Sequence, residues 1–66
     1  MFELIELDNK ESFGMNCLNK TGDFHYDGNV FYFDAMRSSR VLSIKRDGSI
    51  LIVKTKNSEY TFREVK

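Results

Sequence analysis

An Asp-Gly pair at positions 47 and 48 divides two alternating, β-branched runs, and this feature limits the possible folds more than any other. Asp-Gly between such runs is the strongest short-range signal for a two-residue β-hairpin, because a type I′ turn needs positive φ at both central positions. With this loop, Ile44 is predicted to face Leu51, and Leu42 to face Val53. These four apolar side chains then share one face of the hairpin.

A weaker turn signal, Asn57-Ser58, extends the hairpin to a three-stranded antiparallel meander over residues 40–65. If this turn is also a two-residue loop, Val53 faces Phe62, and Tyr60 joins the same apolar face. The opposite face is predicted to be basic but not purely polar. It carries Ser43, Lys45, Ile50, Ile52, Lys54, Lys56, Thr61, Arg63 and Val65.

Residues 24–33 are predicted to form a second hairpin around Asp27-Gly28. A two-residue turn pairs Phe24 with Phe31, whereas a three-residue turn through Asn29 would change that register. On the two-residue register the core side chains are Phe31 and Phe33, with Tyr32 opposite. Residues 34–39 are expected to be a polar connector, with one short helical turn in it as the alternative.

The N-terminal part is predicted to begin with a strand over residues 1–7, with Ile5 and Leu7 on one side and Phe2 and Leu4 on the other. Residues 9–20 fit two patterns, an apolar stripe at helical spacing and an alternation typical of a strand. Their asparagines and glycine suit neither state. We favour a strand or irregular β structure there, with one short helix within 9–20 as the alternative.

The chain has 66 residues, so we expect a single small domain over residues 1–66. Nine aromatic residues and no proline favour a folded domain. One cysteine and one histidine exclude an internal disulfide and an ordinary zinc site. The predicted fold is mainly β, a small antiparallel meander rolled into an SH3-like or half-open barrel.

The net charge of zero conceals two halves of opposite sign. Residues 1–36 hold two basic and seven acidic side chains, and residues 37–66 hold eight basic and three acidic ones. The halves either neutralise each other in the fold or create a polyanion-binding face. No run of about 18 apolar residues exists, and the start lacks the basic leader of a signal peptide. We therefore expect a cytoplasmic protein that does not enter a membrane.

Sequence motifs of enzymes are absent, so we predict a protein that is not an enzyme and needs no cofactor or metal. Cys17 and His25 are the one conceivable nucleophile and base, but no third group is placed to orient them. A buried structural thiol and an ordinary strand histidine are the expected roles of these two residues.

Binding of a protein partner is the predicted function, with a homodimer as one form of it. A surface that mixes apolar and cationic side chains suits an interface, and tyrosine and arginine are frequent hot-spot residues. The candidate binding residues are Lys45, Lys54, Arg63, Ile50, Ile52, Tyr26, Tyr32 and Arg37. The alternative is a small β-barrel that binds single-stranded nucleic acid, with Lys45, Lys54 and Arg63 on phosphates.

The pattern S-x-V at residues 39–41, a glycine turn at residue 48 and T-x-N-S-x-Y at residues 55–60 resembles small uncharacterised proteins of bacteriophages and other mobile elements of bacteria. The resemblance covers about 20 of the 66 residues. It implies a β-meander and an origin in a phage or prophage, hence the cytoplasm of a bacterial or phage-infected cell. It also implies a modulator or inhibitor of a host protein as a form of the protein-binding function.

Overall fold

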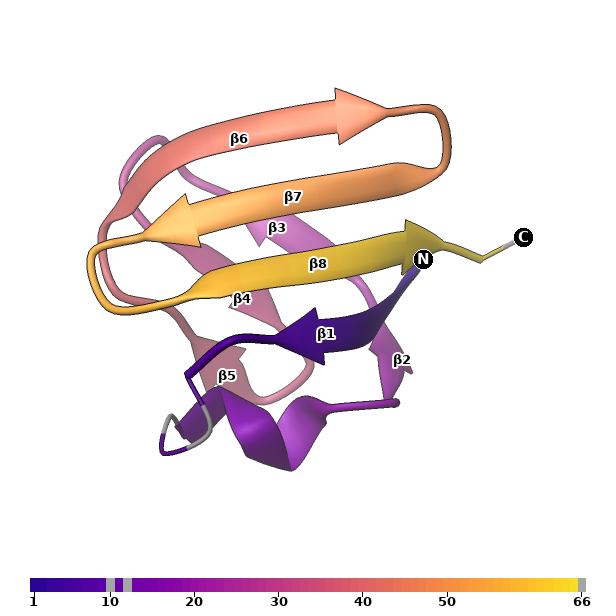
Figure 1. Cartoon of the computed structure of the whole chain (residues 1–66), viewed down its shortest axis with the longest axis horizontal. Helices are drawn as coiled ribbons and strands as arrows, with labels where there is room; N and C mark the ends of the chain where they lie inside the picture. The colour runs from indigo at the N-terminus through magenta and orange to yellow at the C-terminus, as the bar shows by residue number, and fades with distance from the viewer. Residues whose placement is uncertain (10, 12, 66) are drawn as a thin grey trace.

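The computed structural model describes residues 1–9, 11 and 13–65 of the chain. Strands alternate with short turns, and one short 3-10 helix follows the first strand (Figure 1). The elements are β1 (Phe2–Leu7), η1 (Phe13–Cys17), β2 (Thr21–Gly22), β3 (Phe24–Tyr26), β4 (Phe31–Phe33), β5 (Met36–Arg37), β6 (Val41–Asp47), β7 (Ile50–Thr55) and β8 (Glu59–Glu64).

The strands form two antiparallel sheets, which confirms the prediction of a mainly β fold. The large sheet has the order β2-β1-β8-β7-β6, and the small sheet has the order β3-β4-β5. The small sheet lies behind the large one in Figure 1 and covers one of its faces. The predicted meander is β6, β7 and β8, and β1 pairs with the far side of β8.

Two short segments carry the chain from one sheet to the other. Asp23 alone separates β2 from β3, and residues 38–40 separate β5 from β6. Backbone bonds continue the pairing across the second corner, since Ser38 N donates to Phe31 O at 2.9 Å and Val41 N donates to Asn29 O at 2.8 Å. The described strands are therefore rolled around one core, but they do not close into a barrel.

Aromatic rings from both sheets make the centre of the core. Phe62 on β8 contacts Phe31 and Phe33 on β4 edge to face, with ring centroids 5.6 and 4.9 Å apart. Tyr60 contacts Phe31 in the same way at 4.9 Å. The buried apolar residues are Leu4, Leu7, Cys17, Phe31, Phe33, Met36, Leu51, Val53, Tyr60 and Phe62.

The core contains only part of the predicted apolar wall of the meander. Leu42 is 59% exposed and Ile44 is 38% exposed, so their assignment to the core is wrong. Val41 packs against the core in place of Leu42. At Leu42 the reason is a bulge in β6, where the register with β7 shifts between Val41 and Ser43. Ile44 keeps the inward register opposite Val53 and is exposed because β6 is the edge strand of the sheet.

Both Asp-Gly hairpins turn one residue later than predicted. Gly48 and Ser49 form the first loop, so Asp47 pairs with Ile50 and Ile44 pairs with Val53. In the second hairpin the loop moves in the same direction, and Phe24 pairs with Phe33. Each glycine therefore takes the first loop position, with φ of +60° at Gly48 and +97° at Gly28. Positive φ at the first loop residue alone is typical of a type II′ turn, whereas type I′ needs it at both.

The predicted Asn57-Ser58 turn also shifts by one residue, in the opposite direction. Thr55 N donates to Ser58 O at 2.8 Å, which leaves Lys56 and Asn57 as the loop. Val53 consequently pairs with Tyr60, and Leu51 pairs with Phe62. Each of these shifts changes the paired residues by two positions, so the inward and outward faces stay as predicted.

Three predictions for the other segments are corrected. A bulge at Ile5 turns both Leu4 and Leu7 into the core, so they do not lie on opposite sides. Residues 13–17 form the 3-10 helix η1, so irregular β structure is wrong there, and Lys10 and Ser12 lie outside the described residues. The supposed connector over residues 34–39 contains β5, which follows a two-residue turn.

Acidification is expected to loosen the β3–β4 turn. The side-chain Oδ1 of Asp27 accepts from Val30 N and Asn29 N, both at 2.9 Å, and these bonds hold the pKa of the carboxyl below its ordinary value. A folded-state pKa below the unfolded one adds stability at pH above the unfolded pKa, and this is lost as pH falls through the folded pKa. We expect the Asn29 and Val30 amide resonances to titrate with that low pKa.

Asp27→Asn is the control for this titration, because an amide oxygen keeps the acceptor and does not titrate in this range. The acid-dependent shifts of Asn29 and Val30 should disappear in this variant. Unchanged shifts would show that another group loosens the turn.

Candidate interaction surfaces

Five of the eight predicted binding residues lie together on the face of the large sheet that points away from the small sheet, which we call the outer face. Lys45 pairs with Ile52 across β6 and β7, and Ile50 pairs with Arg63 across β7 and β8. Lys54 lies on the same face, because the side chains of a strand alternate and both Val53 and Thr55 are buried. The sequence therefore predicted the residues of one continuous surface.

No described segment covers the outer face, which points toward the viewer in Figure 1. Ile50 and Ile52 are half-buried there, whereas Leu51 and Val53 on the other face are buried in the core. The covered face of the meander is therefore the apolar one. The outer face presents a pair of isoleucines between charged side chains.

Ion pairing reduces the basic character of the outer face. Arg63 Nη2 lies 2.6 Å from Glu3 Oε1, which neutralises the third predicted phosphate-binding residue. Lys45 and Lys54 form no ion pair within the described part of the chain. The acidic N-terminal half and the basic C-terminal half therefore neutralise each other in part, since β1 pairs with β8.

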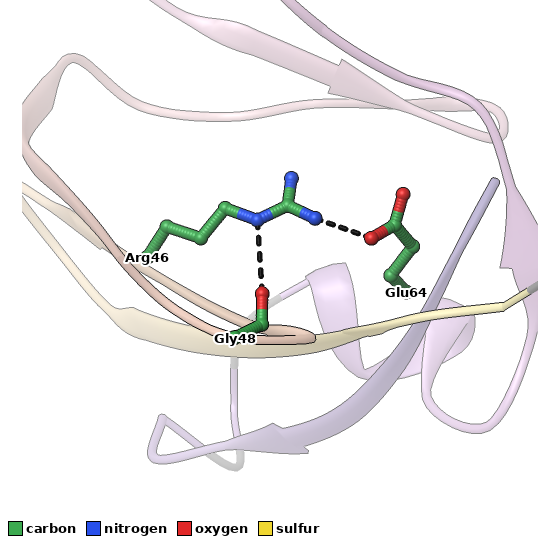
Figure 2. Close-up of polar contacts among 3 residues, drawn as sticks. All are labelled: Arg46, Gly48 and Glu64. Atoms are coloured by element: carbon green, nitrogen blue, oxygen red, sulfur yellow. Dashed lines mark hydrogen bonds and ion pairs between the residues drawn. The ribbon is translucent and has the colours of Figure 1, made fainter.

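Arg46 does not belong to the outer face. It pairs with the buried Leu51, so its side chain points to the core side of β6. Figure 2 shows its guanidinium forming an ion pair with Glu64, while its Nε donates to the carbonyl of Gly48 at 3.0 Å. The guanidinium carbon also lies 5.7 Å from the centroid of the Phe2 ring. Arg46 thus ties β6 to β8 and β1.

The outermost strand of the large sheet, β6, is exposed over most of its length. Val41 is half-buried, and every residue from Leu42 to Asp47 is exposed. Edge strands in natural proteins are commonly short, covered or charged, because their free backbone groups invite another strand. We call residues 42–47 the β6 edge, and its apolar members are Leu42 and Ile44.

The ladder of the large sheet shows which amides of the β6 edge are free. Ser49 O accepts from Glu64 N on β8 at 2.7 Å, and Lys56 N donates to Arg40 O on the opposite side at 3.0 Å. Because bonding alternates along an antiparallel strand, the even-numbered residues of β7 bond to β6. Their partners in β6 are Ser43, Lys45 and Asp47. The N–H groups of Ile44 and Arg46 therefore point away from the sheet.

Sequence reasoning missed the β6 edge, although β6 contains a usable signal. Residues 45–47 are three consecutive charged residues, which suits an edge strand better than a central one. The placement of Leu42 and Ile44 in the core, together with the Asp-Gly register, concealed that signal.

The other predicted binding residues lie on the small sheet, away from the outer face. Tyr32 pairs with Arg37 on one side and with His25 on the other, so the three side chains form a row on its outward face. The rings of His25 and Tyr32 stack with centroids 6.2 Å apart. Tyr26 is 42% exposed at the end of β3 and lies outside this row. The structure therefore separates the predicted aromatic groups from the lysines.

The thiol of Cys17 lies in the core, and its burial, together with the charge of Asp34, raises its pKa. His25 is exposed on the outward face of the small sheet, so the two residues do not face each other. Within the described residues no group of three or more His, Cys, Asp or Glu side chains could hold a metal ion.

No helix in residues 1–9, 11 and 13–65 has the length and apolar character needed to cross a membrane. Comparison with protein-family models, with curated proteins and with solved structures gave no match.

Proposed function

We propose that this chain is a non-enzymatic protein-binding module that adds an extended segment of a partner to the β6 edge. The observation that carries the proposal is an edge strand with outward N–H groups at Ile44 and Arg46 and exposed apolar side chains at Leu42 and Ile44. Added strands gain affinity from main-chain hydrogen bonds and specificity from alternate side chains. The outer face adjoins this edge and extends the contact to Ile52.

The charges of β6 indicate the chemistry of the partner. On the outer face an added strand would continue the row of Lys45 and Ile52, so an acidic side chain beside Lys45 is favoured. On the core side it would contact Ile44, where an apolar side chain is favoured. The preferred partner segment thus alternates apolar and acidic residues. A second copy of β6 would bring Lys45 and Arg46 of both copies together, which disfavours self-association.

Ile44→Pro is expected to abolish binding of a synthetic peptide of alternating valine and glutamate. Proline removes the outward N–H of residue 44, and an edge position tolerates it because that N–H does not bond within the sheet. Ile44→Thr is the matched control, since it loses apolar surface but keeps the N–H. We expect binding at least about 10-fold weaker for proline than for threonine, measured by fluorescence anisotropy of the labelled peptide.

Amide hydrogen exchange of the unmodified protein makes the test independent of how well the proline variant folds. The peptide should slow exchange at Ile44 and Arg46, whereas Lys45 is protected in the free protein by its bond to β7. A matched peptide of valine and lysine should bind more weakly. Slowed exchange elsewhere only, or equal binding of both peptides, would contradict the proposal, and dimerisation in light scattering would identify a second copy as the occupant.

Binding of single-stranded nucleic acid stays a prediction, and no feature of the described structure favours it. Arg63 is paired with Glu3, and the row of Tyr32 lies on the other sheet. Binding of labelled oligonucleotides should be strongest at low salt, and absence of binding there would remove this alternative.

The sequence resemblance to proteins of phages and other mobile elements narrows the proposed partner. On that basis the partner is a protein of the bacterial host, and the two proteins meet in the bacterial cytoplasm.

A further inference from the structure

A half-open pocket of about 390 Å³ lies where η1, β5 and the β7–β8 turn meet. This volume is within the range of small-molecule sites, about 300–1,000 Å³. The pocket is distant in sequence from the charged part of the β6 edge, and no residue of that edge lines it. Its lining residues are Asn9, Gly14, Met36, Arg37, Ser39, Asn57, Ser58 and Tyr60.

The buried lining residues of the pocket are Gly14, Met36, Ser58 and Tyr60. A Cβ on Gly14 would lie 2.9 Å from Met36 Sδ and 3.0 Å from Tyr60 Cε2, so the missing side chain lets these groups come together. A thioether and an aromatic ring offer apolar contact to a ligand. This region suits a short apolar group.

The exposed part is polar and partly held in place by its own hydrogen bonds. Asn57 Nδ2 donates to Ser39 Oγ at 2.7 Å, and Asn9 Nδ2 donates to Asn57 O at 3.4 Å. These bonds join the β7–β8 turn to the β5–β6 corner and to the segment after β1. Polar groups that are fixed before binding lose less conformational entropy when a ligand arrives.

Charge defines the ligand class. Among the described lining residues Arg37 alone is charged. Its exposed side chain leaves the edge strand β5 on the face opposite to the buried Met36, and it forms no ion pair with another described residue. Ser58 Oγ is buried with no hydrogen-bond partner among the described atoms. A guanidinium matches the oxygens of carboxylates and phosphates in a bidentate geometry. The site therefore combines an unpaired cation, hydroxyl and amide groups, and an apolar floor.

We propose that this pocket binds a small ligand that carries a carboxylate or a phosphate beside a short apolar group. The anionic oxygens contact Arg37, and the Ser39 hydroxyl and the Asn57 side chain lie at the same rim. The apolar group contacts Met36 and Tyr60. The pocket is separate from the β6 edge, so an experiment on ligand binding tests it independently of strand addition.

Titration of ¹⁵N-labelled protein with propionate, ethyl phosphate and neutral propionamide tests the proposal. Saturable shifts of the Gly14, Ser39 and Asn57 amides are expected with one or both anions and not with propionamide. The two anion arms decide between carboxylate and phosphate. Arg37→Gln should weaken binding at least about 10-fold, since a charge-assisted hydrogen bond is lost.

Arg40→Gln is the matched control, because it removes the same charge from an exposed position that does not line the pocket. Its affinity for the anions should stay within about twofold of the unmodified protein, since an exposed charge outside the site is screened by salt. If both substitutions weakened anion binding equally, the effect would come from net charge alone, and the proposed site would be wrong. Absence of saturable shifts at the lining residues with both anions would also overturn it.

Discussion

Phe62→Ala is expected to lower the free energy of unfolding by about 3–5 kcal/mol, the usual cost of truncating a buried phenylalanine. The ring is fully buried and contacts the rings of Phe31 and Phe33 in the small sheet. It also contacts Phe2 and Phe24, with centroids 6.5 and 5.3 Å away. The cavity would be lined by aromatic rings from both sheets. These rings are held by their own strands, so they can move only a little to fill the cavity.

A loss of this size approaches the whole stability of a domain this small, about 5 kcal/mol by general experience. We expect Phe62→Ala to be largely unfolded in buffer or to unfold at very low urea concentration. Leu42→Ala is the matched control, because the sequence assigned both residues to one apolar face while the structure leaves Leu42 59% exposed. Its unfolding free energy should change by less than about 0.5 kcal/mol. Similar urea midpoints for the two variants would contradict the structure.

The contrast between these residues shows what alternation in the sequence could predict. Period-2 patterning identified the inward side of β7 and β8 correctly, because a strand that is shifted by two positions keeps its faces. It could not show where the core ends across the sheet. Leu42 and Ile44 have the inward pattern, but β6 is an edge strand and the small sheet does not enclose their side chains.

Turn chemistry gave the right hairpins with the wrong loops. The sequence could identify Gly28 and Gly48 as the residues with positive φ, but not whether they would take the first or the second loop position. The carboxylate of Asp27 accepts hydrogen bonds from two backbone amides, so Asp27 precedes the loop and is not part of it. These bonds fix the shifted register. That choice depends on local hydrogen bonds, which the dipeptide alone does not encode.

Candidate binding residues were predictable only where they belong to one meander. Lys45, Ile50 and Ile52 come together on the outer face because hairpin geometry makes neighbours of residues close in sequence. The pocket was not predictable in this way, since Asn9, Arg37 and Asn57 meet only through the rolling of both sheets. No local sequence pattern identifies residues that come together in this way. For Asn57 the sequence indicates only that it belongs to a turn.

Gly14→Ala is expected to destabilise the domain by about 1–3 kcal/mol, the typical cost of forcing an extra methyl group into a packed core. The new Cβ would meet Met36 Sδ at 2.9 Å, Tyr60 Cε2 at 3.0 Å and Leu7 Cδ2 at 3.3 Å. Met36 has a flexible side chain that can yield. The Tyr60 ring cannot move freely, because it packs edge to face against Phe31. Thermal and urea unfolding of the variant would measure the loss.

Gly22→Ala separates steric conflict at Gly14 from the general effect of replacing glycine. A Cβ on Gly22 would meet Asp34 atoms at 3.5 and 3.6 Å, which is ordinary van der Waals contact. Its effect should stay within about 1 kcal/mol, because the lower entropy of the unfolded chain offsets small costs. Met36→Ala in the Gly14→Ala background should cost less than the sum of the two single changes. The shorter side chain at position 36 removes the close contact of the new methyl group with Sδ, and that methyl group fills part of the space that Met36 leaves. Strict additivity would show that the tight packing at Gly14 does not cause the loss.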